Sequence, residues 1–99
     1  MNIIVSGDNL EVGDTLNKYT KDKVGLVFAK YSFNPVHCNI TFSKNQNEFD
    51  CYISSYIDAS VGFQSKYSDR DVYTSLRICM YRFEKQLRRF KRKLKVHSF

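Results

Sequence analysis

The sequence of 99 residues has no uninterrupted apolar run near the roughly 20 residues that a helix needs to span a bilayer. Its N-terminus, M-N-I-I-V-S-G-D, lacks the basic n-region of a secretory signal peptide. Nothing in the sequence directs export. We therefore expect a cytoplasmic protein.

The sequence also lacks the patterns that support catalysis or bind a cofactor. It has no C-x-x-C pair, no paired histidines at zinc-binding spacing, no glycine-rich phosphate loop and no nucleophile elbow. His37 and Cys38 are adjacent, but neighbours on a strand point to opposite faces and cannot form a nucleophile–base pair. Cys51 and Cys79, like Cys38, have apolar neighbours and are expected to be small buried side chains. We expect no enzyme activity, cofactor, metal or small-molecule substrate.

A hydrophobic fraction of 42% is typical of a globular chain, and its length suffices for one modest core. No repeat, low-complexity tract or linker divides it. We predict a single domain over residues 1–99, with a basic tail at about 91–99.

The first third of the chain predicts a strand and a helix. A β-branched run at residues 2–6 is followed by turn residues at 7–9. Asp14 is expected to cap a helix that continues to about Lys30. Its apolar positions recur at helical spacing and are Leu16, Thr20, Val24, Val27 and Tyr31.

From residue 36 the apolar period changes from helical spacing to two. Residues 36–43 alternate, and residues 49–58 alternate again after a polar loop at 44–48. A hairpin at 59–62 leads to a short strand at 63–67. Three strands with short links predict a meander that has one solvent-exposed face.

Residues 69–95 predict a long amphipathic helix, and Ser68 with Asp71 resembles a helix-start signal. Its apolar stripe is Val72, Leu76, Met80, Phe83, Leu87, Phe90 and Leu94. The element order is therefore β-α-β-β-β-α. Both helices must bury their stripes on the one apolar sheet face, so we predict an α+β fold with a four-stranded sheet and two helices packed on one face.

The net charge of +6 is concentrated in the last quarter of the chain. Residues 1–75 sum to −2, whereas residues 76–99 hold nine Lys and Arg against one acid, Glu84. On a helix most of these cations form two rows, Arg82, Lys85, Arg89 and Lys93, and Arg77, Arg88, Arg92 and Lys95. Such a basic element on a near-neutral body indicates a polyanionic partner.

RNA is the polyanion that the pattern favours. An anionic membrane would require exposed apolar residues beside the cations, whereas here the apolar stripe is needed for the core. The charge pattern does not separate RNA from DNA, but no DNA-recognition helix or dimer-spacing device is visible. A protein-interaction or membrane-surface domain is the third hypothesis.

Four segments resemble motifs of the bacterial ribosome hibernation-promoting factors, also called ribosome-associated inhibitors or ribosomal subunit interface proteins. They are residues 7–12 (G-D-N-L-E-V), 16–23 (L-N-K-Y-T-K-D-K), 71–76 (D-V-Y-T-S-L) and the basic residues 82–95. The motifs occur in the family's order and spacing across essentially the whole chain. Gly13 departs from the Ser or Thr cap common in the family, and Lys66 lies in a strand that is often acidic.

The resemblance implies a double-stranded-RNA-binding-like fold that docks on the small ribosomal subunit, on rRNA in the channel that holds mRNA and tRNA. It implies inhibition of translation in stationary phase or stress, with inactive ribosomes or ribosome dimers as partners. The chain resembles the short form, which acts beside a separate ribosome modulation factor.

By position, the resemblance assigns rRNA contacts to Lys23, Arg82, Lys85, Gln86, Arg89 and Lys93. Charge alone adds Arg88, Lys91 and Arg92. The alternative is a general double-stranded-RNA-binding module that acts off the ribosome. Against it, such a module uses lysines at the start of its second helix, where residues 69–71 are acidic on balance.

Overall fold

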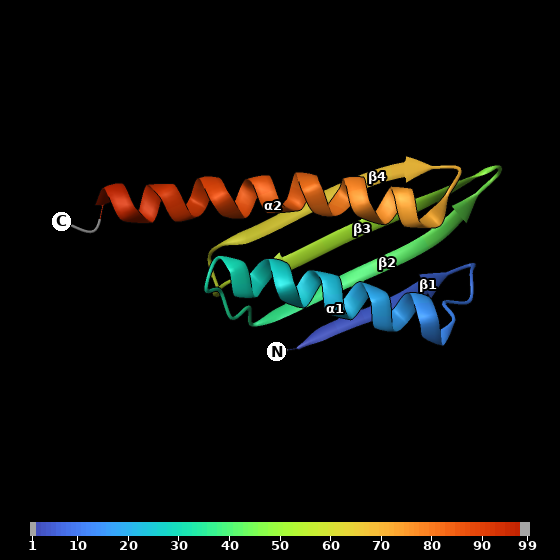
Figure 1. Cartoon of the computed structure of the whole chain (residues 1–99), viewed down its shortest axis with the longest axis horizontal. Helices are drawn as coiled ribbons and strands as arrows, with labels where there is room; N and C mark the ends of the chain where they lie inside the picture. Colours follow the sequence, from blue (N-terminus) through green and yellow to red (C-terminus); the bar gives the residue numbers. More distant parts are fainter. Residues whose placement is uncertain (1, 98–99) are drawn as a thin grey trace.

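The computed structural model describes residues 2–97, with side chains as far as Leu94. Residues 98–99 of the predicted basic tail, and the side chain of Lys95 from the second basic row, lie outside the described residues. The elements are β1 (Ile3–Asp8), α1 (Asp14–Lys30), β2 (His37–Asn45), β3 (Glu48–Tyr56), β4 (Gly62–Asp69) and α2 (Val72–His97), as Figure 1 shows. This is the predicted order β-α-β-β-β-α.

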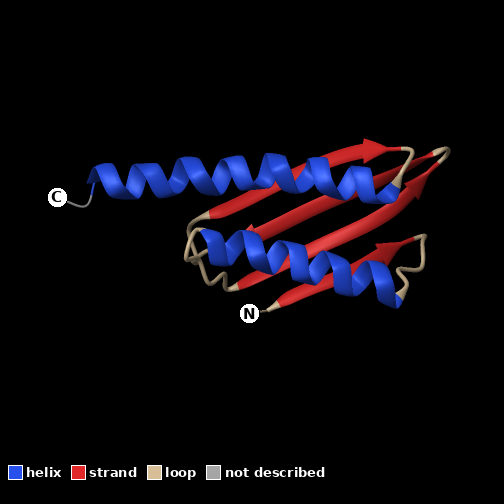
Figure 2. Ribbon diagram, viewed as in Figure 1, coloured by secondary structure: helices blue, strands red, loops and turns tan. Residues whose placement is uncertain are grey.

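The four strands form one mixed sheet in the order β1-β2-β3-β4. The predicted meander is confirmed, because β2, β3 and β4 pair antiparallel. β1 pairs parallel with β2, and α1 makes the crossover between them. Both helices lie side by side on one face of the sheet, as predicted (Figures 1 and 2).

The core lies between that sheet face and the two helices. Its fully buried apolar side chains are Val24, Phe28, Cys38, Ile40, Phe42, Cys51, Ile53, Leu76, Cys79, Phe83 and Leu87. Phe28 of α1 and Phe83 of α2 meet edge to face with ring centroids 5.8 Å apart. Burying a large apolar side chain contributes about 1.5–3 kcal/mol, so this layer holds both helices on the sheet.

Phe28 was missing from the stripe predicted for α1. Thr20 and Val24 are buried as expected, but the next fully buried position is Phe28, one turn on, and Val27 is only half-buried. Phe28 is buried there because its ring packs against Phe83 of α2, a contact that the spacing within α1 alone does not reveal.

The strand boundaries differ from the predicted ones where the ladders continue into polar residues. β1 extends through Gly7 and Asp8, which pair with β2. A Cβ on Gly7 would lie 1.9 Å from the backbone oxygen of Leu10, so the chain needs glycine there. The loop expected at 44–48 is a two-residue turn, since the ladder of β2 and β3 continues to its last pair, Asn45 with Glu48.

Both predicted helix caps were wrong by a few residues. Gly13, not Asp14, is the N-cap of α1, and Asp14 lies in the first turn, where its charge meets the positive end of the helix dipole. Ser68 belongs to β4 and donates its hydroxyl to Asp50. Asp71 caps α2 instead, because its carboxylate accepts the backbone N–H of Thr74 at 2.9 Å.

The C-terminal part of α2 extends beyond the sheet and α1 (Figure 1). Leu87 is fully buried, but Leu94, predicted as part of the buried stripe, is 45% exposed. The prediction failed there because the helix is longer than the layer beneath it. The helix also continues to His97, so the part of the basic tail that the structure describes is helical.

Candidate nucleic-acid interface

The basic residues of α2 lie on two flanks of the helix and on the outer surface between them. The flank toward β4, here the strand flank, holds Arg82, Gln86, Arg89 and Lys93, which helical spacing places on one side. The flank toward α1, here the helix flank, holds Arg77, Glu84, Arg88 and Lys91. Tyr81, Lys85 and Arg92 lie on the outer surface between them.

On the strand flank, Arg82 lies against β4. Its guanidinium carbon is 4.9 Å from the ring centroid of Tyr67. Arg89 and Lys93 are exposed further along. Lys85, from the same predicted row, lies closer to the outer surface, with its amine 4.8 Å from the ring centroid of Tyr81. Tyr81 is itself 57% exposed, so an aromatic face lies among the cations where an unpaired base can stack.

Gln86 is engaged with the sheet edge. Its side-chain nitrogen donates to the backbone oxygen of Gln64 at 2.6 Å, and its side-chain oxygen accepts the N–H of Gln64 at 3.3 Å. The amide therefore continues the ladder of β4 and fixes α2 against that strand. Its predicted RNA contact stays a prediction, and its position also serves the fold.

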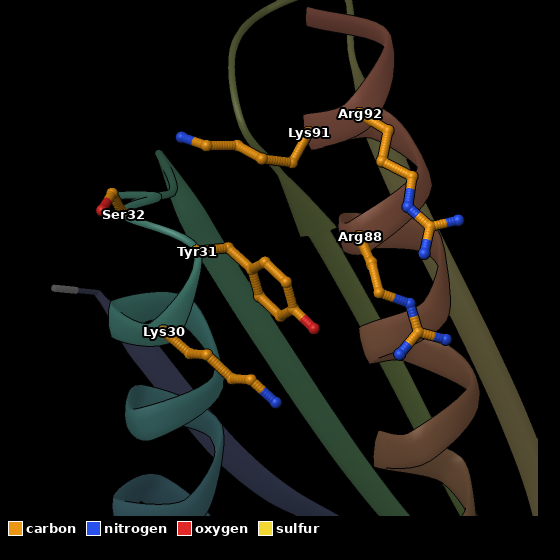
Figure 3. A pocket seen from close by; sticks show the side chains of 6 residues that line it. All are labelled: Lys30, Tyr31, Ser32, Arg88, Lys91 and Arg92. Carbon is orange, nitrogen blue, oxygen red and sulfur yellow. The ribbon is translucent and has the colours of Figure 1, made fainter. Parts of the chain in front are cut away.

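The helix flank faces a pocket of about 290 Å³ between the C-terminal end of α1 and α2 (Figure 3). Arg88, Lys91 and Arg92, which the sequence added on charge alone, line it from α2. Its other lining residues are Lys30, Tyr31 and Ser32. The sequence analysis did not assign these three to a site, because only the parallel packing of two distant helices brings them to α2.

Glu84, the one acid of the basic segment, lies beside this pocket. Its carboxylate accepts hydrogen bonds from the amine of Lys30 at 2.9 Å and from the hydroxyl of Tyr31 at 2.8 Å. The hydrogen bond and charge of Lys30 hold the pKa of Glu84 below its ordinary value, and Glu84 raises the pKa of Lys30. Glu84 thus neutralises Lys30 and joins α1 to α2.

Unlike Lys30 of α1, the cations of α2 have no carboxylate partner among the described residues. The ion pairs found there are Lys30–Glu84 and Lys18–Asp22, the latter within α1. The described part of α2 therefore presents a positive surface whose charge is not cancelled from within the chain.

Lys23, the predicted contact on α1, lies apart from the pocket. Its amine is 5.5 Å from the ring centroid of Tyr19, and Tyr19 meets Tyr73 of α2 edge to face at 5.2 Å. Lys23 precedes Lys30 by two helical turns, or about 10 Å along the axis. It therefore extends the positive surface along the contact between the helices toward their N-terminal ends.

The described side chains form no cluster that could hold a metal ion, and the cysteines lie in the core. Within residues 2–97, no group of three or more His, Cys, Asp or Glu side chains is placed to hold a metal ion. The three cysteines are buried and unpaired, as expected for small core side chains, and burial raises the pKa of the Cys38 thiol to about 12. None of the described helices is long and apolar enough to cross a membrane.

Comparison with known proteins identifies one family and two curated relatives that share a name. Residues 3–95 match the family described as sigma 54 modulation protein / S30EA ribosomal protein. The chain is 28% identical over 97 residues to a ribosome hibernation promotion factor of Rhizobium meliloti, covering 98% of this chain and 51% of the relative. It is 28% identical over 98 residues to the protein of the same name in Bradyrhizobium diazoefficiens, covering 99% of this chain and 48% of the relative.

Two solved structures share the fold. The N-terminal domain of Protein Y from Thermus thermophilus matches with a TM-score of 0.79 at 24% identity, covering 91% of this chain and 99% of that one. A ribosomal subunit interface protein from Coxiella burnetii matches with a TM-score of 0.76 at 18% identity, covering 92% and 98%. The chain spans about half the length of the two curated relatives.

Proposed function

The chain belongs to the sigma 54 modulation protein / S30EA ribosomal protein family, and we propose that it is a non-catalytic ribosome hibernation factor that binds ribosomal RNA. The observation that carries the proposal is the charge of α2. Residues 76–99 sum to +8, and their one acid, Glu84, is already paired with Lys30 of α1. The names of the two curated relatives support the same function.

The proposed partner is rRNA of the small ribosomal subunit, in the decoding channel that holds mRNA and tRNA. A straight, positively charged helix is a shape that can follow a folded phosphate backbone, and guanidinium groups form paired hydrogen bonds with phosphate oxygens. The proposed contacts are Lys23, Arg82, Lys85, Gln86, Arg88, Arg89, Lys91, Arg92 and Lys93. Bound there, the protein inhibits translation by occupying the channel, and needs no chemistry to do so.

The physiological setting of the proposal is a cytoplasmic response to stationary phase or stress. The bound ribosomes are inactive, as monomers or as dimers, and a separate ribosome modulation factor is a proposed co-partner. The family match and the relatives' names support the inactive ribosomes in this setting, and the co-partner and the growth phase are part of the proposal.

Co-sedimentation with purified small subunits tests the proposal. Changing Lys85, Arg88 and Arg89 together to Glu reverses three charges of α2 and is expected to abolish co-sedimentation. A control that changes Lys18, Lys44 and Lys66 to Glu alters the net charge equally, away from α2. It is expected to retain binding, and circular dichroism checks that both variants fold. Unchanged binding by the α2 variant would rule the proposal out.

The salt dependence of binding separates the ribosome from plain RNA as the target. Each phosphate contact contributes about −0.7 to −0.9 to the slope of log affinity against log salt, so several contacts give a steep slope. A hibernation factor should prefer small subunits over an RNA duplex at equal salt. Tight, salt-sensitive binding to duplexes with no preference for ribosomes would favour a double-stranded-RNA-binding module that acts off the ribosome.

A further inference from the structure

The pocket between α1 and α2 brings together four cations from two helices. Figure 3 shows Lys30 and Tyr31 pointing from α1 toward α2, with Arg88 and Arg92 one turn apart on α2. Lys91 reaches back across the end of α1, and its amine lies 5.1 Å from the ring centroid of Phe33. In Figure 3 the guanidinium groups of Arg88 and Arg92 turn the other way from Lys91, so the four cations line from different sides a pocket that neither helix forms alone.

The charge inside this pocket is unbalanced. Glu84 pairs with Lys30, and the charge of Arg88 also helps to lower the pKa of Glu84, but Arg88, Lys91 and Arg92 form no ion pair among the described residues. Arg88 and Arg92 are four residues apart on one helix, where like charges repel. A bound anion would relieve that repulsion and take hydrogen bonds from both guanidinium groups.

The end of α1 does not by itself require these cations. Lys30 already provides a basic residue in its last turn. The N–H of Phe33 bonds to the carbonyl of Phe28 at 2.9 Å, and that of Ser32 to Ala29 at 3.1 Å. These two bonds form the motif that ends a helix with a left-handed residue, here Ser32 at φ 57°. The three cations of α2 are therefore in excess of what capping needs.

We propose that this pocket is a phosphate-binding subsite that takes one or two adjacent phosphate groups. Its volume of about 290 Å³ lies at the lower end of small-molecule pockets, which suits a phosphate or diphosphate group and not a whole large ligand. Paired guanidinium groups match phosphate oxygens, and Lys91 adds an ammonium donor. The phosphate comes from an RNA backbone, in which case the inference rests on the proposed function, or from a free phosphorylated compound.

The first test is an NMR titration of the full chain with inorganic pyrophosphate at constant ionic strength, without ribosomes. We expect saturable shifts confined to the amides of residues 30–32 and 88–92. The variant R88Q/R92Q should weaken binding about tenfold or more, equivalent to at least about 1.4 kcal/mol. The matched control R70Q/R77Q removes two exposed guanidinium groups that lie outside the pocket and outside the proposed rRNA contacts, and should change the affinity less than about twofold.

Two outcomes would overturn the inference. One is the absence of saturable binding in the wild-type chain. The other is equal weakening in both double variants, which would mean that pyrophosphate senses only the overall charge of the chain. Thermal melts without pyrophosphate check that both variants fold, so that a loss of binding is not a loss of structure.

A second titration identifies the source of the phosphate. If an RNA backbone supplies it, a short single-stranded RNA should shift the same amides, and pyrophosphate should displace it. If a free compound supplies it, the RNA leaves these amides unshifted while pyrophosphate still binds. Either result supports the subsite. A wild-type chain that binds pyrophosphate but fails to co-sediment with small subunits would refute the proposed function and leave the subsite standing.

Discussion

Residues 72–87 and 88–97 of α2 form one continuous helix but meet different surroundings. The first part, here the seated half, buries Leu76, Cys79, Phe83 and Leu87 completely on the sheet. In the second part, here the overhanging half, Leu94 is 45% exposed. The phenylalanine of this part, Phe90, is only half-buried, against the ring of Phe33.

The difference shows how one helix can stabilise the fold with its first part and present a binding surface with its second. Forming the first turn of a helix costs free energy, whereas adding residues to a formed helix costs little. The seated half can therefore extend into the overhanging half without burying more surface. With less of its surface packed against the fold, the overhanging half carries a cation at most of its positions. Its side chains are held on a rigid rod that reaches past the sheet, where a large partner has access.

The largest expected effect in this comparison is on the core. Phe83→Ala should lower the free energy of unfolding by about 3–5 kcal/mol, because it leaves a cavity among fully buried side chains. Leu94→Ala removes the same kind of stripe residue from the overhanging half. It should change stability by no more than about 0.5 kcal/mol. Urea unfolding followed by circular dichroism measures both.

If Leu94→Ala destabilised the chain as much as Phe83→Ala, the two halves would be one packed unit. That result would contradict the distinction between them. Leu87→Ala offers an intermediate point, since Leu87 is the last fully buried position of the stripe. It should cost about 2–5 kcal/mol and place the boundary after residue 87.

The next effect concerns how the seated half begins. Asp71→Ala removes the carboxylate that accepts the N–H of Thr74, and should cost about 1 kcal/mol. Asp14→Ala is the matched control on α1, where no side-chain cap bond exists and only the helix-dipole interaction is lost. Thermal melts of the two variants should rank Asp71→Ala as the more damaging. An equal loss would show that the cap bond adds nothing beyond charge.

The sequence predicted the element order and both faces of the central strands because the spacing of apolar residues depends only on neighbouring positions in the chain. Cys38, Ile40 and Phe42 alternate with polar neighbours, and all three are fully buried. Helix starts were harder, since Ser68 and Asp71 both fit a cap pattern and only the strand pairing of Ser68 with Asp50 decides between them. Leu94 fits the stripe as well as Leu87 does, and no local signal states where the sheet ends.

The positive charge of the candidate site could be predicted from the sequence, but the arrangement of its residues in space could not. Nine cations after residue 75 are visible in the sequence, and so is their placement on one helix. The grouping of Arg88 with Lys30 depends on α1 and α2 lying parallel, with the C-terminal end of α1 beside the middle of α2. It depends also on Glu84 reaching Lys30, 54 positions away in the chain. Such contacts follow from tertiary packing, which no spacing rule encodes.

The smallest expected effect tests the link at the boundary between the two halves, where Glu84 bonds Lys30 and Tyr31. Because the folded chain lowers the pKa of Glu84 below its ordinary value of 4.5, the link stabilises the fold above that pH. Its contribution is lost as the pH falls through the lowered value. The raised pKa of Lys30 sets the other limit, since that contribution is lost only above its ordinary value of 10.5.

Glu84→Gln should therefore lower the melting temperature slightly across neutral pH, because solvent screens a pair in which Lys30 is exposed. The difference from wild type should disappear on acidification through the lowered pKa of Glu84, where the wild-type carboxylate also loses its charge. Asp22→Asn, which breaks the more exposed pair with Lys18, is the control and should have a smaller effect. A Glu84→Gln deficit that persisted unchanged in acid would mean that the hydrogen bonds of Glu84, and not its charge, join the helices at this boundary.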